Sequence, residues 1–529
     1  MTLEQKIGAM LMLGWEGDNP IEDATVCDKA REIVEEMQVG GIILMGRNIR
    51  PDDLSVTVNT INELQSMSRE PLLVNVDQEG GMVARFTDGV AVMPSNMALG
   101  ATRRPDLAYE AATTCAEELR AIGVNYNFAP SVDVNNNPDN PIIGTRSYSE
   151  SPDMVAEFGA EAIRGYQDAG VVACAKHFPG HGDTAVDSHL ALPSVPYPRE
   201  RLDEIELKPY ASSIEAGVSS IMTTHIMFPA LDPDLPSTLS KKIITGVLRE
   251  EMGYDGVIVT DSMEMKAIAD NWGVAEACVL AIEAGVDLVL IPHTLSAQRE
   301  SREAIIKAVR DGRISEGRLD ESVARLTALK QRYGLNQRRY ADPSALGRLL
   351  RTPEHLAIQK QIAELSVTLV RNENGVVPLR LKADERLLVI GTHGTVPALA
   401  SAIGKHHGSV EAITLTGDRE DALRQAMEAA SDAGAIVVPT CPLEPWKPPT
   451  DQALQTDLVK ALDATAKKLV VVSVREPYEL RKFPEVGAYV CTYGYREGML
   501  DAAAALIFGA IEPCGVLPVT IPLSLPEMG

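Results

Sequence analysis

DMVAEFGAEAIRGYQDAGVVACAKHF (153–178) contains one predicted helix and the strand that follows it. In its first part, 153–170, apolar residues recur at the three- and four-residue spacing of an amphipathic helix. In its second part, 171–178, they form the short continuous run of a strand that is buried on both faces. A helix followed by such a strand indicates a βαβ arrangement with parallel strands.

The same alternation of apolar runs and helical segments continues on both sides of this unit. It makes seven or eight units in roughly the first 340 residues, which fits a (β/α)8 barrel of the TIM type better than an open sheet. The other runs are GGIILMG (40–46), PLLVNVD (71–77), VNYNFAPSVDV (124–134), SSIMTTHIMF (219–228), GVIVTD (256–261) and VDLVLIP (286–292).

A second alternating series begins after a stretch that interrupts the pattern, QRRYADPSALGRLLRTPEH (337–355). QKQIAELSVTLVRN (359–372) is predicted to be a helix, and the strands after it predict a smaller α/β domain with a mostly parallel sheet. We therefore expect a barrel over 1–340, a linker over 341–355 and a second domain over 356–529. The predicted strands are RLLVIG (386–391), GAIVVPT (434–440), KLVVVSV (468–474) and AYVCTYGY (488–495).

The bulk composition narrows the class of protein. A net charge of −25 argues against nucleic acid as a partner, because polyanions are bound by clustered Lys and Arg. No apolar stretch approaches the ~20 residues of a membrane span. The N-terminus has no basic leader and reads as an amphipathic helix with Leu3, Ile7, Met10 and Leu11 on one face. The seven cysteines are odd in number and form no C-x-x-C pair, so we expect a reducing, cytoplasmic location.

Polar residues stand where several of the predicted strands end. In a barrel of this type the working residues gather at the carboxyl ends of the strands. Several polar strand ends at one face of the barrel predict a polar pocket there, although a solvated loop would explain any one of them. These residues are Asp77, Lys176, His177, His225, Asp261 and His293.

The segment KHFPGHGDTAVDSH (176–189) carries the densest group of titratable side chains. Its glycines and proline predict a loop held in turn conformations. Asp187 and His189 are two residues apart, so in an extended segment both side chains point to the same side. A carboxylate beside an imidazole sets its tautomer and raises its pKa, which suits proton transfer. The alternative is a surface loop with incidental histidines.

Two further interpretations of the motifs stay open at this point. The histidines and aspartates of 176–189 are also metal-ligand types, but no H-E-x-x-H pattern is present, and Pro179 and Gly180 separate His177 from His181. Asp261 follows the β-prone run GVIVT and precedes a predicted helix start. It is either a nucleophile in the barrel mouth or a helix N-cap. VIGTHG (389–394) lacks the Rossmann spacing, so a tight turn is a better interpretation than a nucleotide site.

Three motifs and their spacing resemble the bacterial β-N-acetylglucosaminidases of glycoside hydrolase family 3. The motifs are VDQEGG (76–81), KHFPGHGDTAVDSH (176–189) and VIVTDSMEMKAI (257–268). SVTLVRNENGVVPL (366–379) and FGAIEPCGVLPVTIP (508–522) resemble the α/β/α sandwich of two-domain members, so the resemblance covers the whole chain.

The resemblance implies a role for individual residues. Asp261 would be the nucleophile and His189 the acid/base, with Asp187 as the partner of His189. One departure is Met82, because many relatives have Arg directly after the EGG. The residues that would contact the terminal N-acetylglucosamine are Asp77, Arg85, Arg146, Lys176 and His177.

The expected activity is therefore retaining hydrolysis of terminal β-linked N-acetylglucosamine, from muropeptides or chito-oligosaccharides. Retention requires a nucleophile and a proton donor on either side of the glycosidic bond. We expect no cofactor and no metal, a small carbohydrate as the substrate, and a monomer or homodimer that contacts neither nucleic acid nor membrane. The alternatives are a phosphorylase that uses the same residues, a non-catalytic sugar-binding module, and a metallohydrolase.

Overall fold

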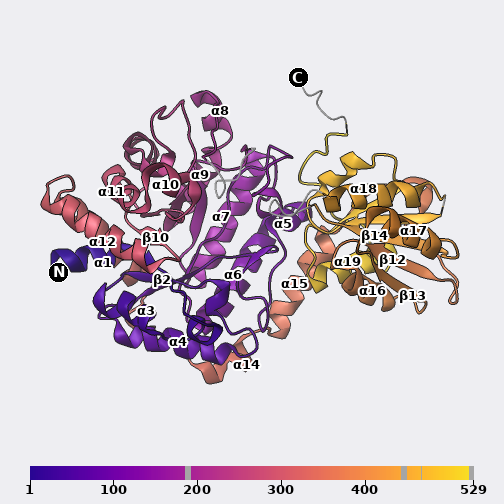
Figure 1. Cartoon of the computed structure of the whole chain (residues 1–529), viewed down its shortest axis with the longest axis horizontal. Coiled ribbons are helices and arrows are strands. Elements are labelled where there is room, and N and C mark those ends of the chain that lie inside the picture. Colours follow the sequence, from indigo (N-terminus) through magenta and orange to yellow (C-terminus); the bar gives the residue numbers. More distant parts are fainter. Residues whose placement is uncertain (185–191, 443–449, 466, 524–529) are drawn as a thin grey trace.

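The computed structural model describes residues 1–184, 192–442, 450–465 and 467–523. They form a larger lobe and a smaller lobe side by side, with helix α15 (Pro353–Ser366) at the junction (Figure 1). In the part of the chain that is described, no helix is both long and apolar enough to cross a membrane.

The larger lobe is a closed barrel of eight parallel strands, as the alternating pattern predicts. Two sheets account for most of its pairings, in the orders β10-β1-β2-β3-β6 and β7-β8-β9. Parallel bridges between Tyr126 and Val172 and between Val259 and Leu288 close the ring. The strands are β1 (Leu11–Leu13), β2 (Gly41–Ile43), β3 (Leu73–Val76), β6 (Tyr126–Asn127), β7 (Cys174–Phe178), β8 (Ser220–Thr223), β9 (Val257–Val259) and β10 (Val289–Ile291).

Amphipathic helices cover the outside of the barrel. In α7 (Pro152–Asp168) the residues Val155, Phe158 and Ile163 recur at helical spacing and are buried. The other longer helices of the lobe are α1 (Leu3–Ala9), α4 (Leu54–Met67), α5 (Asn96–Thr102), α6 (Pro105–Ile122), α8 (Arg199–Glu204), α9 (Lys208–Glu215), α10 (Lys266–Trp272), α11 (Val274–Ala284), α12 (Leu295–Arg310) and α13 (Glu316–Arg332). Short helices are α2 (Pro20–Asp23), α3 (Asp28–Arg31) and α14 (Leu346–Leu349).

The first barrel strand corrects the expectation for the N-terminus. The predicted helix does not extend to Met10 and Leu11, because α1 ends at Ala9 and Leu11 begins β1. All three residues of β1 are buried between β10 and β2. A strand buried on both faces shows no polar alternation, so three apolar residues after a helix cannot be told from one more helical turn by pattern alone.

The smaller lobe is an α/β/α sandwich around a six-stranded sheet in the order β11-β16-β15-β14-β12-β13. Only the pairing of β11 with β16 is antiparallel. Figure 1 shows the sheet between α16 with α19 on one face and α17 with α18 on the other. The elements are β11 (Thr368–Asn372), β12 (Leu387–Gly391), α16 (Val396–Gly404), β13 (Val410–Thr414), α17 (Arg419–Ala430), β14 (Ala435–Thr440), α18 (Thr450–Asp463), β15 (Lys468–Ser473), β16 (Ala488–Cys491) and α19 (Glu497–Ile507).

The predicted helix over 359–372 is wrong in its second half. Helix α15 ends at Ser366, and 368–372 forms the edge strand β11. The β-branched residues of this segment, Val367, Thr368 and Val370, favour a strand. Its hydrogen bonds go to β16, which lies more than a hundred residues later, so only the tertiary pairing decides between the two conformations.

The carboxyl ends of both sets of parallel strands meet at the junction of the lobes. The Ser95 hydroxyl donates to the Tyr493 carbonyl at 2.8 Å, and Asn135 donates to the Tyr478 hydroxyl at 2.7 Å. Tyr478 and Tyr493 follow β15 and β16, whereas Asn135 follows β6. Loops from the second sheet therefore stand over the face of the barrel where strand-end residues gather.

Glu479, on one of these loops, makes the stability of the protein depend on pH. Its side chain is 2% exposed and accepts a hydrogen bond from Gln455 at 2.5 Å. Burial raises its pKa from 4.5 to about 7. Between these values the folded protein keeps a proton that the unfolded chain has released, so stability falls as pH rises from about 5 to 8.

We expect Glu479→Gln to be stabilising relative to the wild type at pH 8 and nearly neutral at pH 5. One pKa unit corresponds to about 1.4 kcal/mol, so the difference at pH 8 is at most roughly 3 kcal/mol. Denaturant titrations at the two pH values measure it. Equal differences at pH 5 and pH 8 would contradict the prediction.

Candidate active site

An open cavity of about 620 Å³ lies at the carboxyl ends of the barrel strands. Its lining includes all of the residues to which the family resemblance gives a role and that the structure describes. The remaining two, Asp187 and His189, lie outside the described residues. His293 also lines the cavity, whereas His225 does not, because its ring nitrogens contact the Thr238 hydroxyl and the Ser262 carbonyl. The six predicted site residues that line the cavity are Asp77, Arg85, Arg146, Lys176, His177 and Asp261.

A network of two carboxylates and three cations forms one wall of the cavity. The Lys176 ammonium contacts Asp77 at 2.9 Å and Glu79 at 2.7 Å. Arg146 binds both oxygens of Glu79, at 2.8 and 2.9 Å, and Arg85 contacts Asp77 at 3.4 Å. Paired guanidinium–carboxylate hydrogen bonds hold both side chains in a defined geometry. Sequence reasoning missed Glu79, although it stands in the QEGG that follows Asp77.

These groups remain charged at neutral pH despite their burial. Glu79 and Lys176 are each only 2% exposed. Burial alone would raise the pKa of Glu79, but Arg146 and Lys176 hold it well below its usual range. Burial would lower the pKa of Lys176, but Asp77 and Glu79 raise it above the usual value. The wall therefore presents fixed ammonium and guanidinium donors to the cavity.

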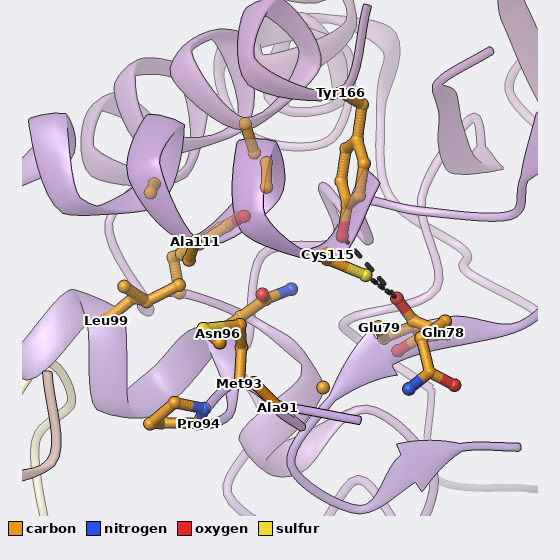
Figure 2. A pocket seen from close by; sticks show the side chains of 15 residues that line it. Gln78, Glu79, Ala91, Met93, Pro94, Asn96, Leu99, Ala111, Cys115 and Tyr166 are labelled. Atoms are coloured by element: carbon orange, nitrogen blue, oxygen red, sulfur yellow. Dashed lines mark hydrogen bonds between the residues drawn. The ribbon is translucent and has the colours of Figure 1, made fainter. Parts of the chain in front are cut away.

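The short strand β4 (Gln78–Gly80), which carries Glu79, is supported from behind. The Gln78 carbonyl accepts hydrogen bonds from Asn127 at 2.9 Å and from the Tyr166 hydroxyl at 3.5 Å. Figure 2 shows Tyr166 and Cys115 reaching this carbonyl from the covering helices, beside a small cavity of about 20 Å³. Packing against α6 and α7 thus fixes the position of Glu79.

His177 is held by a buried aspartate that the motifs did not reveal. Asp133, which is 1% exposed, contacts His177 Nδ1 at 2.7 Å and accepts from the backbone N–H of His181, also at 2.7 Å. On the other side of the ring, His177 Nε2 lies 3.3 Å from an Arg146 amino group. Because arginine can only donate, His177 carries its proton on Nδ1 and accepts at Nε2.

A shift in strand register brings Lys176 and His177 into one cavity. In a regular strand consecutive side chains point to opposite faces. Here the pairing of β7 with β8 shifts between Ala175 and Phe178, and both intervening side chains line the cavity. Such an irregularity redirects a side chain, which is why bulges recur beside active sites.

Asp261 lies in the cavity wall, after β9. One of its carboxylate oxygens accepts the backbone N–H of Ser262 at 2.7 Å. The N-cap interpretation is wrong, because the next helix, α10, begins at Lys266 and its N-cap is Met265. The Asp261 carboxylate therefore faces the cavity rather than the end of a helix.

The described part of the loop after β7 is tied to the barrel. Asn140 donates to the carbonyls of His181 and Gly182, both at 2.9 Å, and Asp183 pairs with Arg201 at 2.6 Å. A Cβ atom at Gly182 would lie 1.7 Å from the Val134 carbonyl, so only glycine fits. Burial lowers the pKa of His181 to about 4, so its ring is neutral. Within the described ranges, no group of three metal-binding side chains is present.

The second lobe also contributes to the cavity. Arg475, which follows β15, and Tyr495, which follows β16, line it together with the barrel residues. Tyr495 ends the predicted strand run 488–495 and Arg475 directly follows the run 468–474, but their contribution to the cavity depends on how the two lobes pack. Met82 lines the cavity as well.

Comparison with known proteins identifies the family. Residues 2–329 match the glycosyl hydrolase family 3 N-terminal domain, and residues 367–528 match the family's C-terminal domain. Beta-hexosaminidase A from Pseudoalteromonas piscicida is 31% identical, with 98% of this chain and 97% of that protein covered. The Cellulomonas fimi beta-N-acetylglucosaminidase/beta-glucosidase is 32% identical, with 91% and 88% covered.

A solved structure supports the same assignment over both lobes. The glycoside hydrolase family 3 beta-N-acetylglucosaminidase from Paenibacillus sp. str. FPU-7 is 40% identical and superposes with a TM-score of 0.90. The match covers 99% of this chain and all of that one. The chain therefore belongs to glycosyl hydrolase family 3 and is a glycoside hydrolase.

Proposed function

We propose that this hydrolase is a retaining exo-β-N-acetylglucosaminidase that uses Asp261 as its nucleophile. The observation that carries the proposal is the shared cavity, in which Asp261 lies with Asp77, Arg146, Lys176 and His177. Relatives named beta-hexosaminidase and beta-N-acetylglucosaminidase support the choice of sugar. Suitable substrates are muropeptides and small chito-oligosaccharides, both of which end in β-linked N-acetylglucosamine.

The wall of fixed charges suits the recognition of a terminal sugar. Lys176, Arg146 and Arg85 supply donors for hydroxyl oxygens, and the Asp77 carboxylate accepts from hydroxyl groups. Because ion pairs hold these groups in place before substrate arrives, little reorganisation accompanies binding. His177 Nε2, with its proton held on Nδ1, acts as an acceptor in the same wall.

In the proposed reaction Asp261 attacks the anomeric carbon while His189 protonates the glycosidic oxygen. The bond to the leaving group breaks, and a covalent glycosyl–aspartate forms. His189 then removes a proton from water, which attacks the same carbon and releases Asp261. Asp187 would orient the imidazole and stabilise its charged form. The leaving group keeps the proton that His189 donated, and His189 regains a proton from water, so the two steps together add one water molecule across the glycosidic bond.

Hydrolysis of 4-nitrophenyl N-acetyl-β-glucosaminide, compared with the glucoside, tests the proposal. We expect a clear preference for the N-acetylglucosaminide and β-N-acetylglucosamine as the first product by NMR. The α-anomer as the first product would overturn retention. A sugar 1-phosphate formed in the presence of phosphate would instead indicate a phosphorylase.

A cytoplasmic location is also proposed. Cys174, Cys278 and Cys491 are free thiols that lie buried among apolar side chains. Unpaired, buried thiols are typical of proteins kept in a reducing compartment. Localisation of the tagged protein by cell fractionation checks this proposal.

We expect Asp133→Asn to lower kcat/KM about 10- to 100-fold, because the variant misplaces a binding group. The new amide would present N–H donors to His177 Nδ1 and move the ring proton to Nε2, where Arg146 already donates. Asp139→Asn is the matched control, since Asp139 pairs with Arg481 on the surface and is 63% exposed. Equal kcat/KM values for both variants would contradict this role for Asp133.

A further inference from the structure

A second cavity, of about 330 Å³, lies at the end of the barrel opposite the candidate active site. Its walls come from α1, from the turns before β2 and β3, and from α13. These turns stand at the amino ends of the strands, whereas the candidate active site lies at the carboxyl ends. Sites for small molecules span about 300–1,000 Å³, so this amino-end cavity has room for a small organic molecule.

Lys330, on α13, lines the amino-end cavity and is half-buried. Within the described residues, no group gives its ammonium a hydrogen bond or an ion pair. Burial lowers the pKa of Lys330 to about 8, although the nearby Glu70 acts in the opposite direction. A buried charge is costly unless it is paired, so an anion in the cavity would supply the partner that Lys330 lacks.

The charges around Lys330 are mostly positive, in a chain whose net charge is −25. The charged side chains in the cavity lining are Lys330, Glu70 and the exposed Arg69, and Arg339 also acts on Lys330. In the part of the chain that the structure describes, Arg69 likewise makes no hydrogen bond or ion pair. The side chains from α1 and from the turn before β2 are uncharged. Three cations and one carboxylate therefore favour an anion in this cavity.

The turns around the amino-end cavity are held in place. Arg339 donates to the carbonyls of Gln65 and Ser68, and the Ser68 hydroxyl donates to the Glu70 carbonyl at 2.7 Å. Before β2, Gln38 has a φ of 52°, a conformation that favours glycine, yet its side chain lines the cavity. A wall that is ordered before a ligand arrives lowers the entropy cost of binding.

We propose that the amino-end cavity is a binding site for a small organic carboxylate. The carboxylate pairs with Lys330 and Arg69, and the uncharged body of the ligand packs on the apolar lining, which includes Val39 and Leu326. A singly charged anion suits the cavity better than a phosphate dianion, because Glu70 offsets part of the positive charge. The inference does not depend on the proposed glycosidase function, since it involves none of the residues assigned to that reaction.

Isothermal titration calorimetry of the protein with benzoate at pH 7 tests the proposal, and benzamide is the uncharged comparison of the same shape. We expect Lys330→Met to weaken benzoate binding about 10- to 100-fold, as the loss of a hydrogen bond to a charged group predicts. Without benzoate this variant is expected to be at least as stable as the wild type, because it lacks the half-buried unpaired charge. Lys307→Met, on the surface of α12 with 76% of its side chain exposed, is the matched control and should bind benzoate as the wild type does.

The pH dependence of binding identifies Lys330 as the partner of the carboxylate. Above a pKa of about 8 the free amine loses its proton, while benzoate stays ionised. Benzoate is therefore expected to bind the wild type about tenfold more weakly at pH 9 than at pH 7, and this difference should vanish in Lys330→Met. The inference fails if benzoate does not bind, or if it binds the wild type and Lys330→Met equally. Binding of benzamide as tight as that of benzoate, or tighter binding of inorganic phosphate, would also overturn it.

Discussion

Replacing Asp261 with alanine is expected to lower kcat on 4-nitrophenyl N-acetyl-β-glucosaminide by about 10⁴-fold or more, the usual cost of removing a catalytic nucleophile. The carboxylate lies in the cavity after β9 and has no helix-capping role that its loss would disturb. The expected change in thermal stability is therefore small. Steady-state kinetics and a melting curve of the same preparation measure both effects.

Azide provides a direct check on the assigned role. In the Asp261→Ala variant, azide would enter the space left by the carboxylate, attack the anomeric carbon and displace nitrophenolate. The product would be the α-glycosyl azide, identified by NMR. Asp255→Ala, two residues before the start of β9 and 92% exposed, is the matched control and should alter kcat by less than about twofold. Full activity of Asp261→Ala would overturn the assignment.

Replacing Glu79 with glutamine is expected to lower the free energy of unfolding by about 3–5 kcal/mol and to weaken substrate binding as well. Glu79 is buried and contacts both Lys176 and Arg146, so its loss leaves two buried cations with one nearby carboxylate. Denaturant titration measures the effect, and fluorescence of the buried Trp15 reports unfolding of the barrel.

The pH dependence of the free energy of unfolding distinguishes the effect of this ion-pair network from the effect of Glu479. The pKa of Glu79 lies well below its usual range in the folded protein, so its stabilisation is fully present above about pH 5 and is lost progressively as the pH falls below that value. The difference in the free energy of unfolding between the wild type and Glu79→Gln should be equal at pH 5 and pH 8. Glu63→Gln, in an exposed pair with Arg31, is expected to change stability by less than about 1 kcal/mol. A comparable loss in both variants would contradict a special role for Glu79.

Much of the site could be predicted from the polar residues that stand where the apolar runs end. Two of the predicted residues, Asp77 and Asp261, follow the strands β3 and β9. The other two, Lys176 and His177, lie within β7, and all four line the cavity. Long apolar runs can be recognised in a sequence because a strand that is buried on both faces contains few polar residues. The three-residue strand β1 and the edge strand β11 were missed, since the first is too short and the second follows a helix without a break. The domain boundaries near 340 and 355 and the oligomeric state stay predictions.

The residues that orient the site were not predictable from pattern. Glu79 stands two residues after Asp77 and Asp133 stands in a predicted strand run, but each acquires its function from partners far away in sequence, as in the contact of Asp133 with His177. Arg475 and Tyr495 belong to the other lobe altogether.

The amino-acid sequence by itself determined the alternating architecture, the two-lobe organisation and the residues at the strand ends, because these follow from local hydrophobic period and the direction of parallel strands. Only the tertiary structure decided which charges pair, which nitrogen of His177 carries the proton and which loops of the second lobe reach the cavity. Those properties depend on distances between segments that are remote in the chain, and burial makes each of these contacts strong enough to matter.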